Sequence, residues 1–430
     1  MKEKIIAIMA EVFEMPISDF PTEITQKTIE NWDSLTHLNL IVELEEAFDK
    51  SFEPEEISKM TSIEKIMNYI ISTSISETLS QEEDSDYEVR YATKEDLPLI
   101  VEFIDNHWKK NHAVVKSKTL MDFCYLNPIT GDYNFVIAQN KKTKKLDAIK
   151  GFIPTYKYDV NLAKEVDLWA AIWKTCKDIE NFSNLSIQIW EKYLKIPNAK
   201  SHATVGMSSD AISFHQSYKG IVGVLSQYYI LNQSIKDFKI AKISNIKPFA
   251  KDSNSAFIKD NFDIESLTEE SIQAGEYRPK KSIEYLKNRY LYHPIYRYNF
   301  WGVFVEDKLK AIWVIRIVKV ETAKALRIVD MYGAGAEVLP CLYNQIQKLL
   351  SKYEAEYIDC LNYGFAEEVF ETMGFSKLDS STNEVIIPDY FEPFEQQNIS
   401  LYFTYKLKDK NDRYVIFKGD ADQDRPNIIQ

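Results

Sequence analysis

The sequence contains little that would support a metal centre, a disulfide framework or a membrane span. Only four cysteines occur in 430 residues, scattered without paired spacing, at Cys124, Cys176, Cys341 and Cys360. This usage is typical of a reducing cytoplasm and gives no zinc-binding pattern. The six histidines show no ligand spacing either. No apolar run approaches the roughly 20 residues of a transmembrane helix, and the first residues lack a signal-peptide pattern. We therefore expect a cytoplasmic protein without a metal site.

Arginine is missing from the first 72 residues. This stretch has 6 lysines against 12 glutamates and 3 aspartates, a net charge of −9 in a chain whose total is −13. A compact acidic region suits docking onto basic surfaces of partner proteins and argues against nucleic-acid binding.

The length of the whole chain allows two or three domains, and its content of 26 tyrosines and 23 phenylalanines indicates substantial cores.

Ser34 stands where a long run of helix-forming residues begins. Asp33 precedes it, and apolar residues then recur at helical spacing at Leu35, Leu38, Val42 and Ala47. Asp-Ser at such a place predicts a helix start with the serine hydroxyl facing solvent. Taken alone, Asp-Ser-Leu is most often a plain helix cap.

The surroundings of this motif resemble an acyl carrier protein over residues 1–72. An amphipathic stretch precedes it at 4–14, the second helix ends in Leu-Glu-Glu-Ala-Phe at 44–48, and two short helical patterns follow at 54–57 and 62–70. Trp32 departs from the common carriers, which have small residues there, and we expect it to change the surface beside Ser34.

The resemblance implies a cofactor and two partner enzymes. Ser34, flanked by Asp33 and Leu35, would carry 4′-phosphopantetheine, added from coenzyme A by a phosphopantetheinyl transferase. The thiol of this arm would hold an acyl group as a thioester, supplied by an acyl-loading enzyme. An acidic helical domain without such a role remains the alternative.

Residues 73–87 are polar and acidic and lack a sustained hydrophobic period. We interpret them as a flexible linker that spans roughly 20 Å on average. Such a tether would hold the carrier at high effective concentration near an active site, on the same chain or on a sister subunit. A homo-oligomer is left open.

Two α/β units follow, at residues 88–235 and 236–430. The first unit shows strand and helix patterns in the order strand, two helices, three strands, helix, strand, helix, strand, and the second shows a helix, a hairpin, a strand, a helix, a strand and a last helix. This order resembles the Gcn5-related N-acyltransferase (GNAT) fold. We therefore predict a multidomain protein: an all-α four-helix carrier domain, then two GNAT-like α/β domains with mixed central sheets.

Two features of the GNAT pattern are missing. Members that use coenzyme A usually have a basic, glycine-containing turn after the third hairpin strand, whereas residues 174–180 contain no glycine. Free coenzyme A is therefore expected to bind poorly. In many members a tyrosine on the last helix protonates the leaving thiolate, and here Phe370 has that place. The segment from Gly333 to Gly335 is a weak phosphate-cradle candidate or a tight turn.

Transfer of an acyl group to an amine requires a group that accepts a proton. Asp167 and Asp330 are suited by their similar strand positions in the two halves, but a lone strand aspartate or core histidine is more often structural. The tail offers candidates for acceptor binding, against the alternative of a frayed C-terminus. The catalytic candidates are Asp330, Asp167, His215, Tyr218 and His202, and the acceptor-binding candidates are Asp422, Asp424 and Arg425.

The two resemblances together imply an N-acyltransferase that moves an acyl or aminoacyl group from a thioester on Ser34 to a small amine. The resemblance suggests a nucleotide-linked amino sugar for surface polysaccharide synthesis as acceptor, and an amino acid is the nearest rival. The alternative from another class is a non-catalytic carrier and docking protein that presents its acyl chain to a separate transferase.

Overall fold

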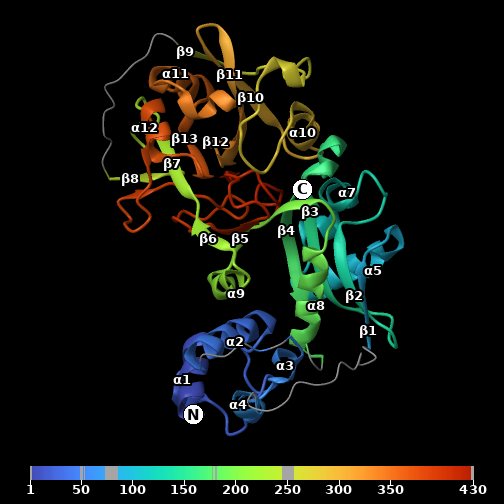
Figure 1. Ribbon diagram of the computed structural model, residues 1–430. Coiled ribbons are helices and arrows are strands. Elements are labelled where there is room, and N and C mark those ends of the chain that lie inside the picture. Colours follow the sequence, from blue (N-terminus) through green and yellow to red (C-terminus); the bar gives the residue numbers. More distant parts are fainter. Residues whose placement is uncertain are drawn as a thin grey trace.

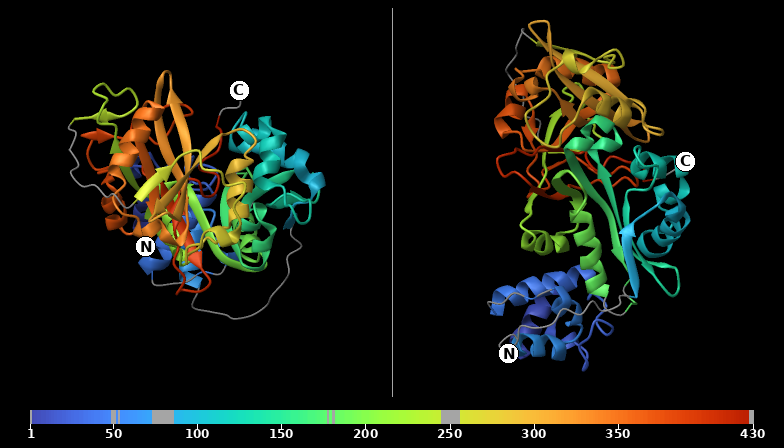
Figure 2. Two further views of the ribbon diagram at one scale, coloured as in Figure 1. Left: turned by 90° about the horizontal axis from the view of Figure 1, so that it is seen from above. Right: turned by 45° about the vertical axis from the view of Figure 1, so that its right-hand side comes forward.

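The computed structural model describes residues 2–48, 52, 54–72, 86–176, 178–179, 182–244 and 256–427. Most of the predicted linker, residues 73–85, lies outside this description. A small helical domain lies at one end of the molecule and two α/β halves form the rest (Figure 1). The C-terminal segment lies between the two halves in both views of Figure 2.

The N-terminal helical domain has its own apolar core. It consists of four helices, α1 (Lys2–Val12), α2 (Ser34–Phe48), α3 (Pro54–Lys59) and α4 (Ile63–Ser72). Apolar residues three and four positions apart place one face of each helix inward. The fully buried members of this core include Ile5, Met9, Leu40, Leu44 and Ile66. The four helices agree with the element pattern expected for residues 1–72.

The first half is built on a seven-stranded mixed sheet of order β1-β2-β3-β4-β5-β16-β6. Its strands are β1 (Tyr87–Tyr91), β2 (Phe135–Asn140), β3 (Leu146–Pro154), β4 (Val166–Thr175), β5 (Ala199–Met207), β6 (Ile221–Val224) and β16 (Tyr402–Leu407). Its helices are α5 (Leu97–Phe103), the π-helix η3 (Ile104–Trp108), α6 (Ala113–Lys116), α7 (Lys118–Tyr125), α8 (Phe182–Leu194) and α9 (Ile212–Ser217). The α8 crossover makes β4 and β5 parallel neighbours.

The second half repeats this plan in the order β14-β7-β13-β12-β11-β10-β9. Its strands are β7 (Ser226–Leu231), β9 (Ala256–Lys259), β10 (Tyr298–Val305), β11 (Lys308–Val320), β12 (Ala323–Tyr332), β13 (Ala355–Tyr363), β14 (Ser376–Lys377) and the short β17 (Ile416–Phe417), which pairs with β13. Its helices are α10 (Ile283–Leu286), α11 (Tyr343–Tyr353) and α12 (Glu367–Met373). The two halves therefore share the mixed α/β architecture expected from the sequence.

The two halves exchange a strand, which the boundary at residue 235 did not anticipate. The sequence predicted one closing strand from 223 to 231, but the chain leaves the first sheet at Leu225 and continues as β7 in the second sheet. The vacant place in the first sheet is filled by β16, which pairs with both β5 and β6. Each half thus depends on a strand from the other.

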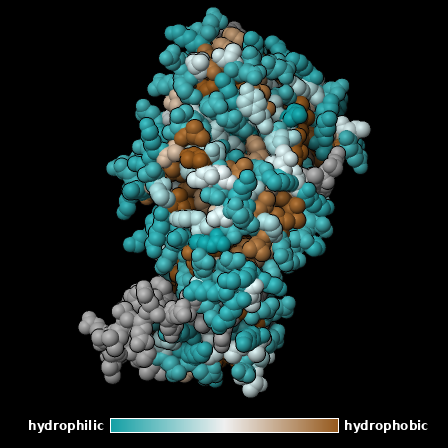
Figure 3. Space-filling model, turned by 90° about the vertical axis from the view of Figure 1, so that its right-hand side faces the viewer, coloured by the Kyte–Doolittle hydropathy of each residue, from teal (hydrophilic) through white to brown (hydrophobic). Residues whose placement is uncertain are grey.

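The surface in Figure 3 is mostly hydrophilic, with hydrophobic atoms in separate patches over the middle of the molecule. Of the helices in the described ranges, none combines the length and the apolar character needed to cross a membrane.

Candidate functional site

Ser34 is the first residue of α2, as the sequence predicted. Asp33 caps this helix, because its Oδ1 atom accepts hydrogen bonds from the backbone N–H groups of Leu35 and Thr36 at 3.0 and 2.9 Å. Such a cap satisfies donors that the first helical turn leaves without partners. Ser34 itself is half-buried rather than fully exposed to solvent.

Ser34 borders a cavity of about 200 Å³ that we call the Ser34 hollow. The helical domain supplies one wall, and the first half supplies the other through Trp108, Trp173, Lys174 and Ser208. Trp173 and Lys174 lie at the end of β4, and Ser208 follows β5. The sequence drew attention to Lys174 only as part of a turn without glycine, and no local pattern marked the other three.

The helical domain contacts the first half directly beside this hollow. Leu38 is 5% exposed and belongs to the same apolar cluster as Trp190 of α8 and Phe214 of α9. Asn39 Oδ1 accepts a hydrogen bond of 3.1 Å from the backbone N–H of Phe214. The helix that begins with Ser34 is therefore held against α8 and α9.

Trp32 does not alter the surface beside Ser34, and that expectation was wrong. Its side chain is 1% exposed and packs in the core of the helical domain. Its Nε1 donates a hydrogen bond of 2.9 Å to Nδ1 of His37, which is itself fully buried. Burial lowers the pKa of His37 to about 4, so the ring remains a neutral acceptor at pH 7.

The Ser34 hollow lies where β4 and β5 separate. The two strands pair only between Val166–Trp169 and Ala199–Ala203. The rest of β4, up to Thr175, has no partner on β5, so the strands part towards the hollow. We call this separation the first splay. Its backbone includes Gly206, which is exposed.

The register of β4 shifts at the first splay. On the β3 side, Ala170 faces Phe152 but Trp173 faces Lys150, so two residues of β4 oppose one of β3. A bulge of this kind bends a strand and turns its backbone groups out of the regular ladder. The bulge lies on the β3 side, and on the other side the backbone of β4 beyond Trp169 is not paired with β5.

The equivalent separation in the second half is filled by the chain itself. β12 and β13 pair as far as Ile328 and Cys360. Beyond that point β17 pairs with β13, and the backbone N–H of Gly419 donates to the carbonyl oxygen of Val329 in β12 at 2.7 Å. The C-terminal segment thus joins both strands across the gap.

Asp330 lies in this filled part of the second half. It is fully buried, and both carboxylate oxygens lie 2.8 Å from Lys281 Nζ. Tyr290 donates a hydrogen bond to it, and Asp420 is a second partner of Lys281 at 2.8 Å. Burial opposes the charge of Lys281, but the two carboxylates outweigh burial and raise its pKa. The surroundings make Asp330 part of a closed ion-pair network.

Asp167 is placed differently, so the expected equivalence with Asp330 is wrong. It lies in the paired part of β4, opposite Ser201, whose hydroxyl donates to it at 2.6 Å. Arg278 of the second half contacts both of its oxygens at 3.2 Å. Burial raises the pKa of Asp167 in spite of these partners. Its evident role is to join the two halves.

Three further catalytic candidates come together on the α8 side of the first sheet. His202, His215 and Tyr218 border one small cavity of about 20 Å³, which is room for about one water molecule. Burial lowers the pKa of His202 to about 4 and that of His215 to about 3. Both rings are neutral at pH 7, but the cavity cannot hold an acceptor substrate.

Lys150 lies beside these histidines and was not found by sequence reasoning. Its side chain is 1% exposed, and its ammonium group lies over the rings of Trp173, Trp190 and Tyr193 at 4.2–4.8 Å. Burial lowers its pKa to about 7. A lysine between an isoleucine and a glycine in a strand gives no local signal of this environment.

The tail is folded between the two halves and is not frayed over the described residues up to 427. Asp424 is 1% exposed, accepts a hydrogen bond of 2.7 Å from Tyr298 and pairs with Arg316 at 3.2 Å. Asp422 pairs with Arg425 at 3.1 Å. The three tail residues predicted from the sequence are therefore ordered, with Asp424 behind the other two.

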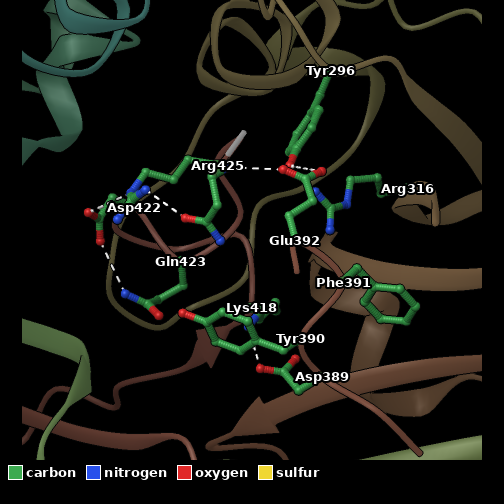
Figure 4. Close-up of a pocket in the computed structure, with 11 residues that line it drawn as sticks. Tyr296, Arg316, Asp389, Tyr390, Phe391, Glu392, Lys418, Asp422, Gln423 and Arg425 are labelled. Atoms are coloured by element: carbon green, nitrogen blue, oxygen red, sulfur yellow. Dashed lines mark hydrogen bonds and ion pairs between the residues drawn. The ribbon is translucent and has the colours of Figure 1, made fainter. Parts of the chain in front are cut away.

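Asp422 and Arg425 border a polar cavity of about 50 Å³, the tail pocket (Figure 4). Its opposite wall carries Tyr296, Arg316 and Glu392. The Tyr296 hydroxyl donates to Glu392 at 2.9 Å, and the guanidinium group of Arg316 lies 4.4 Å from the centre of the Tyr296 ring. Residues of this wall come from β11 and from the loops before β10 and β16, so no single stretch of sequence indicates them.

Gln423 connects the tail pocket to the first splay. Its side chain borders the tail pocket and also lies against Gly206 of β5. A Cβ atom added at Gly206 would lie only 2.2 Å from Gln423 Oε1. Ala421 packs in one apolar cluster with Ile172 of β4 and Val205 of β5. The tail therefore covers one face of the first splay, opposite α8.

Two weaker motifs have structural roles. The Gly333–Gly335 turn packs tightly on β11, since a Cβ at Gly335 would lie 2.7 Å from the carbonyl oxygen of Lys310. This contact favours the tight-turn interpretation over a phosphate cradle. Phe370 is fully buried and stacks on Tyr228 with ring centres 3.9 Å apart.

Neither protein-family models nor curated protein sequences match this chain. Among solved structures, it is similar to a conserved Enterococcus faecalis protein (9% identity, 75% of this chain and 72% of that chain, TM-score 0.45) and to a GCN5-related N-acetyltransferase from Anabaena variabilis (8%, 75% and 72%, 0.42). It is also similar to Saccharomyces cerevisiae N-myristoyltransferase with bound myristoyl-CoA and inhibitors (8%, 80% and 83%, 0.37). Likenesses at this level assign no activity to the chain.

Proposed function

We propose that this chain is an N-acyltransferase whose donor acyl group is attached through phosphopantetheine to Ser34 and is received by the first α/β half. The observation that carries the proposal is the position of Ser34 at the open end of the first splay. A carrier serine that faced away from both halves would not support transfer within this molecule.

The residues around Ser34 suit a phosphodiester-linked arm. Lys174 offers a cation for the phosphate on the far wall of the hollow, and a charge-assisted contact of this kind is strong. The stretch of β4 from Lys174 to Ala170 is about 13 Å long, at some 3.3 Å per residue. This is the distance along which an arm with its phosphate at Lys174 would extend into the first splay. A donor fixed to Ser34 has no adenine nucleotide to hold, which agrees with the missing glycine turn.

When bound, the arm would supply the acyl group as a thioester. In the transfer, the acyl carbon forms an amide bond to the amine nitrogen and its bond to sulfur breaks. The amine loses one proton and the released sulfur gains one. The chain itself orients the reactants. Trp108 and Trp173 wall the entrance and limit water, and the backbone of β4 that is not paired with β5 offers polar contacts to a carbonyl.

Only the first half is proposed to take the donor. In the second half, β17 and Gly419 bond to β13 and β12 in the corresponding gap. An arm could enter there only if these backbone hydrogen bonds were broken. The second half instead contributes walls of the tail pocket, where we place the amino group of the acceptor. A nucleotide-linked amino sugar is the proposed acceptor class, and an amino acid is the alternative.

The test begins with the full-length protein coexpressed with a phosphopantetheinyl transferase. Intact mass should show one arm per chain, and Ser34→Ala should show none. Acyl groups loaded on the wild-type protein should then be transferred to amines. Failure to modify Ser34, together with rapid turnover of free acyl-coenzyme A, would overturn the proposal.

A carrier and docking protein without catalysis is the second candidate, favoured by the filled second splay and by Phe370. Ser34→Ala protein given an acyl-charged N-terminal domain in trans separates the two. Faster amide formation than the uncatalysed reaction supports the transferase. Binding of the charged domain without any amide product supports the docking protein.

A further inference from the structure

The tail pocket does not end at Tyr296 and Arg316. These two residues, together with Phe391 and Glu392, also line a groove of about 500 Å³ along β11 and the start of β10, so the pocket and the groove adjoin each other. Arg297 and Lys319 lie along this groove, and both are exposed. We call it the β11 groove.

Charge is distributed unevenly between the two parts. In the tail pocket each cation has a carboxylate partner: Lys418 lies 2.6 Å from Asp389 and Arg425 lies 3.1 Å from Asp422. In the β11 groove, neither Arg297 nor Lys319 has an ion-pair partner within the described part of the chain. Glu392 also lines the groove and accepts hydrogen bonds from the Tyr296 hydroxyl and the backbone N–H of Asn427. The groove thus holds two cations without an ion-pair partner beside one hydrogen-bonded carboxylate, in a protein with a net charge of −13.

We propose that the acceptor is an amine that also carries a phosphate group, with the amine in the tail pocket and the phosphate on Arg297 and Lys319. This inference rests on the proposed function, since it names the acceptor of that reaction. The carboxylate of Glu392 suits an ammonium group, whereas Asp422 is already paired with Arg425. Gln423 places this end next to the first splay.

Phosphate fits the β11 groove better than a carboxylate does. A phosphate monoester or a diphosphate has a charge near −2 and several acceptor oxygens, so it can engage two separate cations at once. Arginine in particular offers a planar fork that matches phosphate oxygens. Arg316, whose guanidinium is mostly buried against Tyr296 and Asp424, forms a fixed floor between the two ends.

The experiment compares glucosamine 6-phosphate with glucosamine, two amines that differ by one phosphate. Binding to the full-length, arm-bearing protein is measured by titration calorimetry, independently of transfer. We expect the phosphorylated amine to bind at least tenfold more tightly. The double variant Arg297→Ala/Lys319→Ala should remove that difference, and Lys308→Ala, an exposed lysine at the other end of β11, should retain it.

The outcomes distinguish a failure of the phosphate site from a failure of the proposed transferase function. Equal binding of the two amines, or equal loss in the Lys308→Ala control, overturns the phosphate site. Preferential binding that depends on Arg297 and Lys319 supports the site, even if no amide forms, and in that case the proposed function alone fails. Transfer to both amines with equal KM would support the transferase and overturn this inference.

Discussion

The amide side chain of Asn39 accepts a hydrogen bond of 3.1 Å from the backbone N–H of Phe214, which joins α2 to α9 across the boundary between the helical domain and the first half. Asn39 is 8% exposed. A buried hydrogen bond that loses its acceptor costs about 1–3 kcal/mol, because the donor is left without a partner. This contact holds Ser34 at the Ser34 hollow.

Asn39→Leu should therefore loosen docking without preventing attachment of the arm. We expect single-turnover transfer by the arm-bearing protein to slow about 5- to 150-fold, the range that corresponds to 1–3 kcal/mol. Glu11→Gln, on the exposed side of α1, is the control and should transfer at the wild-type rate. Modification of Ser34, followed by intact mass, should be the same in all three proteins.

Transfer within one chain also predicts a rate that does not depend on protein concentration. We expect the first-order rate constant of charged wild-type protein to stay constant over a hundredfold dilution, because the carrier is already docked. Delivery between chains would instead make the rate proportional to concentration. Addition of excess uncharged Ser34→Ala protein should leave the rate of the wild-type protein unchanged.

Lys150 is expected to destabilise the fold at neutral pH. Its pKa is lowered to about 7 by burial, whereas a lysine in an unfolded chain titrates near 10.4. Below pH 7 Lys150 is protonated in both the folded and the unfolded state, and its burial lowers the free energy of unfolding by the full amount. Between about pH 7 and 10 the unfolded state binds more protons than the folded state, so this loss of stability becomes smaller as the pH rises. Lys150→Met should stabilise the protein by up to a few kcal/mol at pH 7.

The measurement is the free energy of unfolding from denaturant titration at several pH values. The advantage of Lys150→Met over wild type should shrink steadily above pH 7. Lys145→Met, at an exposed position at the end of the same hairpin, should show no such trend. A Lys150→Met protein less stable than wild type at pH 7 would mean that the three aromatic rings stabilise the charged form more than burial opposes it.

Much of the architecture could be predicted because it depends on local pattern. Hydrophobic spacing and the Asp33 cap are short-range features, and they placed α2 and its first residue correctly. The same reasoning located β3 and the hairpin of β10 and β11, which are mostly apolar runs bounded by polar turns. The strands among these elements are buried at consecutive positions, Ala148–Pro154 in β3 and Ala311–Ile315 in β11, and such apolar runs can be recognised whichever sheet they join.

The strand exchange and the site walls depend on contacts between distant segments. Residues 402–407 have the composition of a strand, but nothing local indicates that they fill the first sheet rather than the second. The Ser34 hollow combines Ser34 with Trp108, Trp173 and Ser208 from three separate segments. Asp167 and Asp330 look alike in sequence because both follow apolar strand residues, yet only pairing partners decide where each strand separates.

Asp330 was the leading candidate for the catalytic base, and its surroundings predict a structural role instead. Asp330→Asn leaves Lys281 with Asp420 as its remaining carboxylate partner. Breaking a buried ion pair in this way costs on the order of 3 kcal/mol. We expect a matching loss in the free energy of unfolding, with the transfer rate of the folded protein within a few-fold of wild type.

A fall of a hundredfold or more in the transfer rate of a stably folded Asp330→Asn variant would instead indicate that Asp330 acts as a base. Asp307→Asn, in the exposed turn of the same half, is the control.

Gly206 and Gln423 provide a direct test of the contact between the tail and the first splay. Gly206 has a φ of +76°, a conformation that costs a non-glycine residue about 1–3 kcal/mol. Gly206→Ala should lose this amount and in addition push Gln423 away, because the new Cβ would lie 2.2 Å from its Oε1. Gln423→Ala removes the obstructing atoms and should relieve that second part only. In a double-mutant cycle, Gly206→Ala/Gln423→Ala should therefore be more stable than the sum of the single changes by at least about 0.5 kcal/mol. Strict additivity would show that the Gln423 amide swings clear of the new Cβ at no cost, so that its contact with β5 adds no stability.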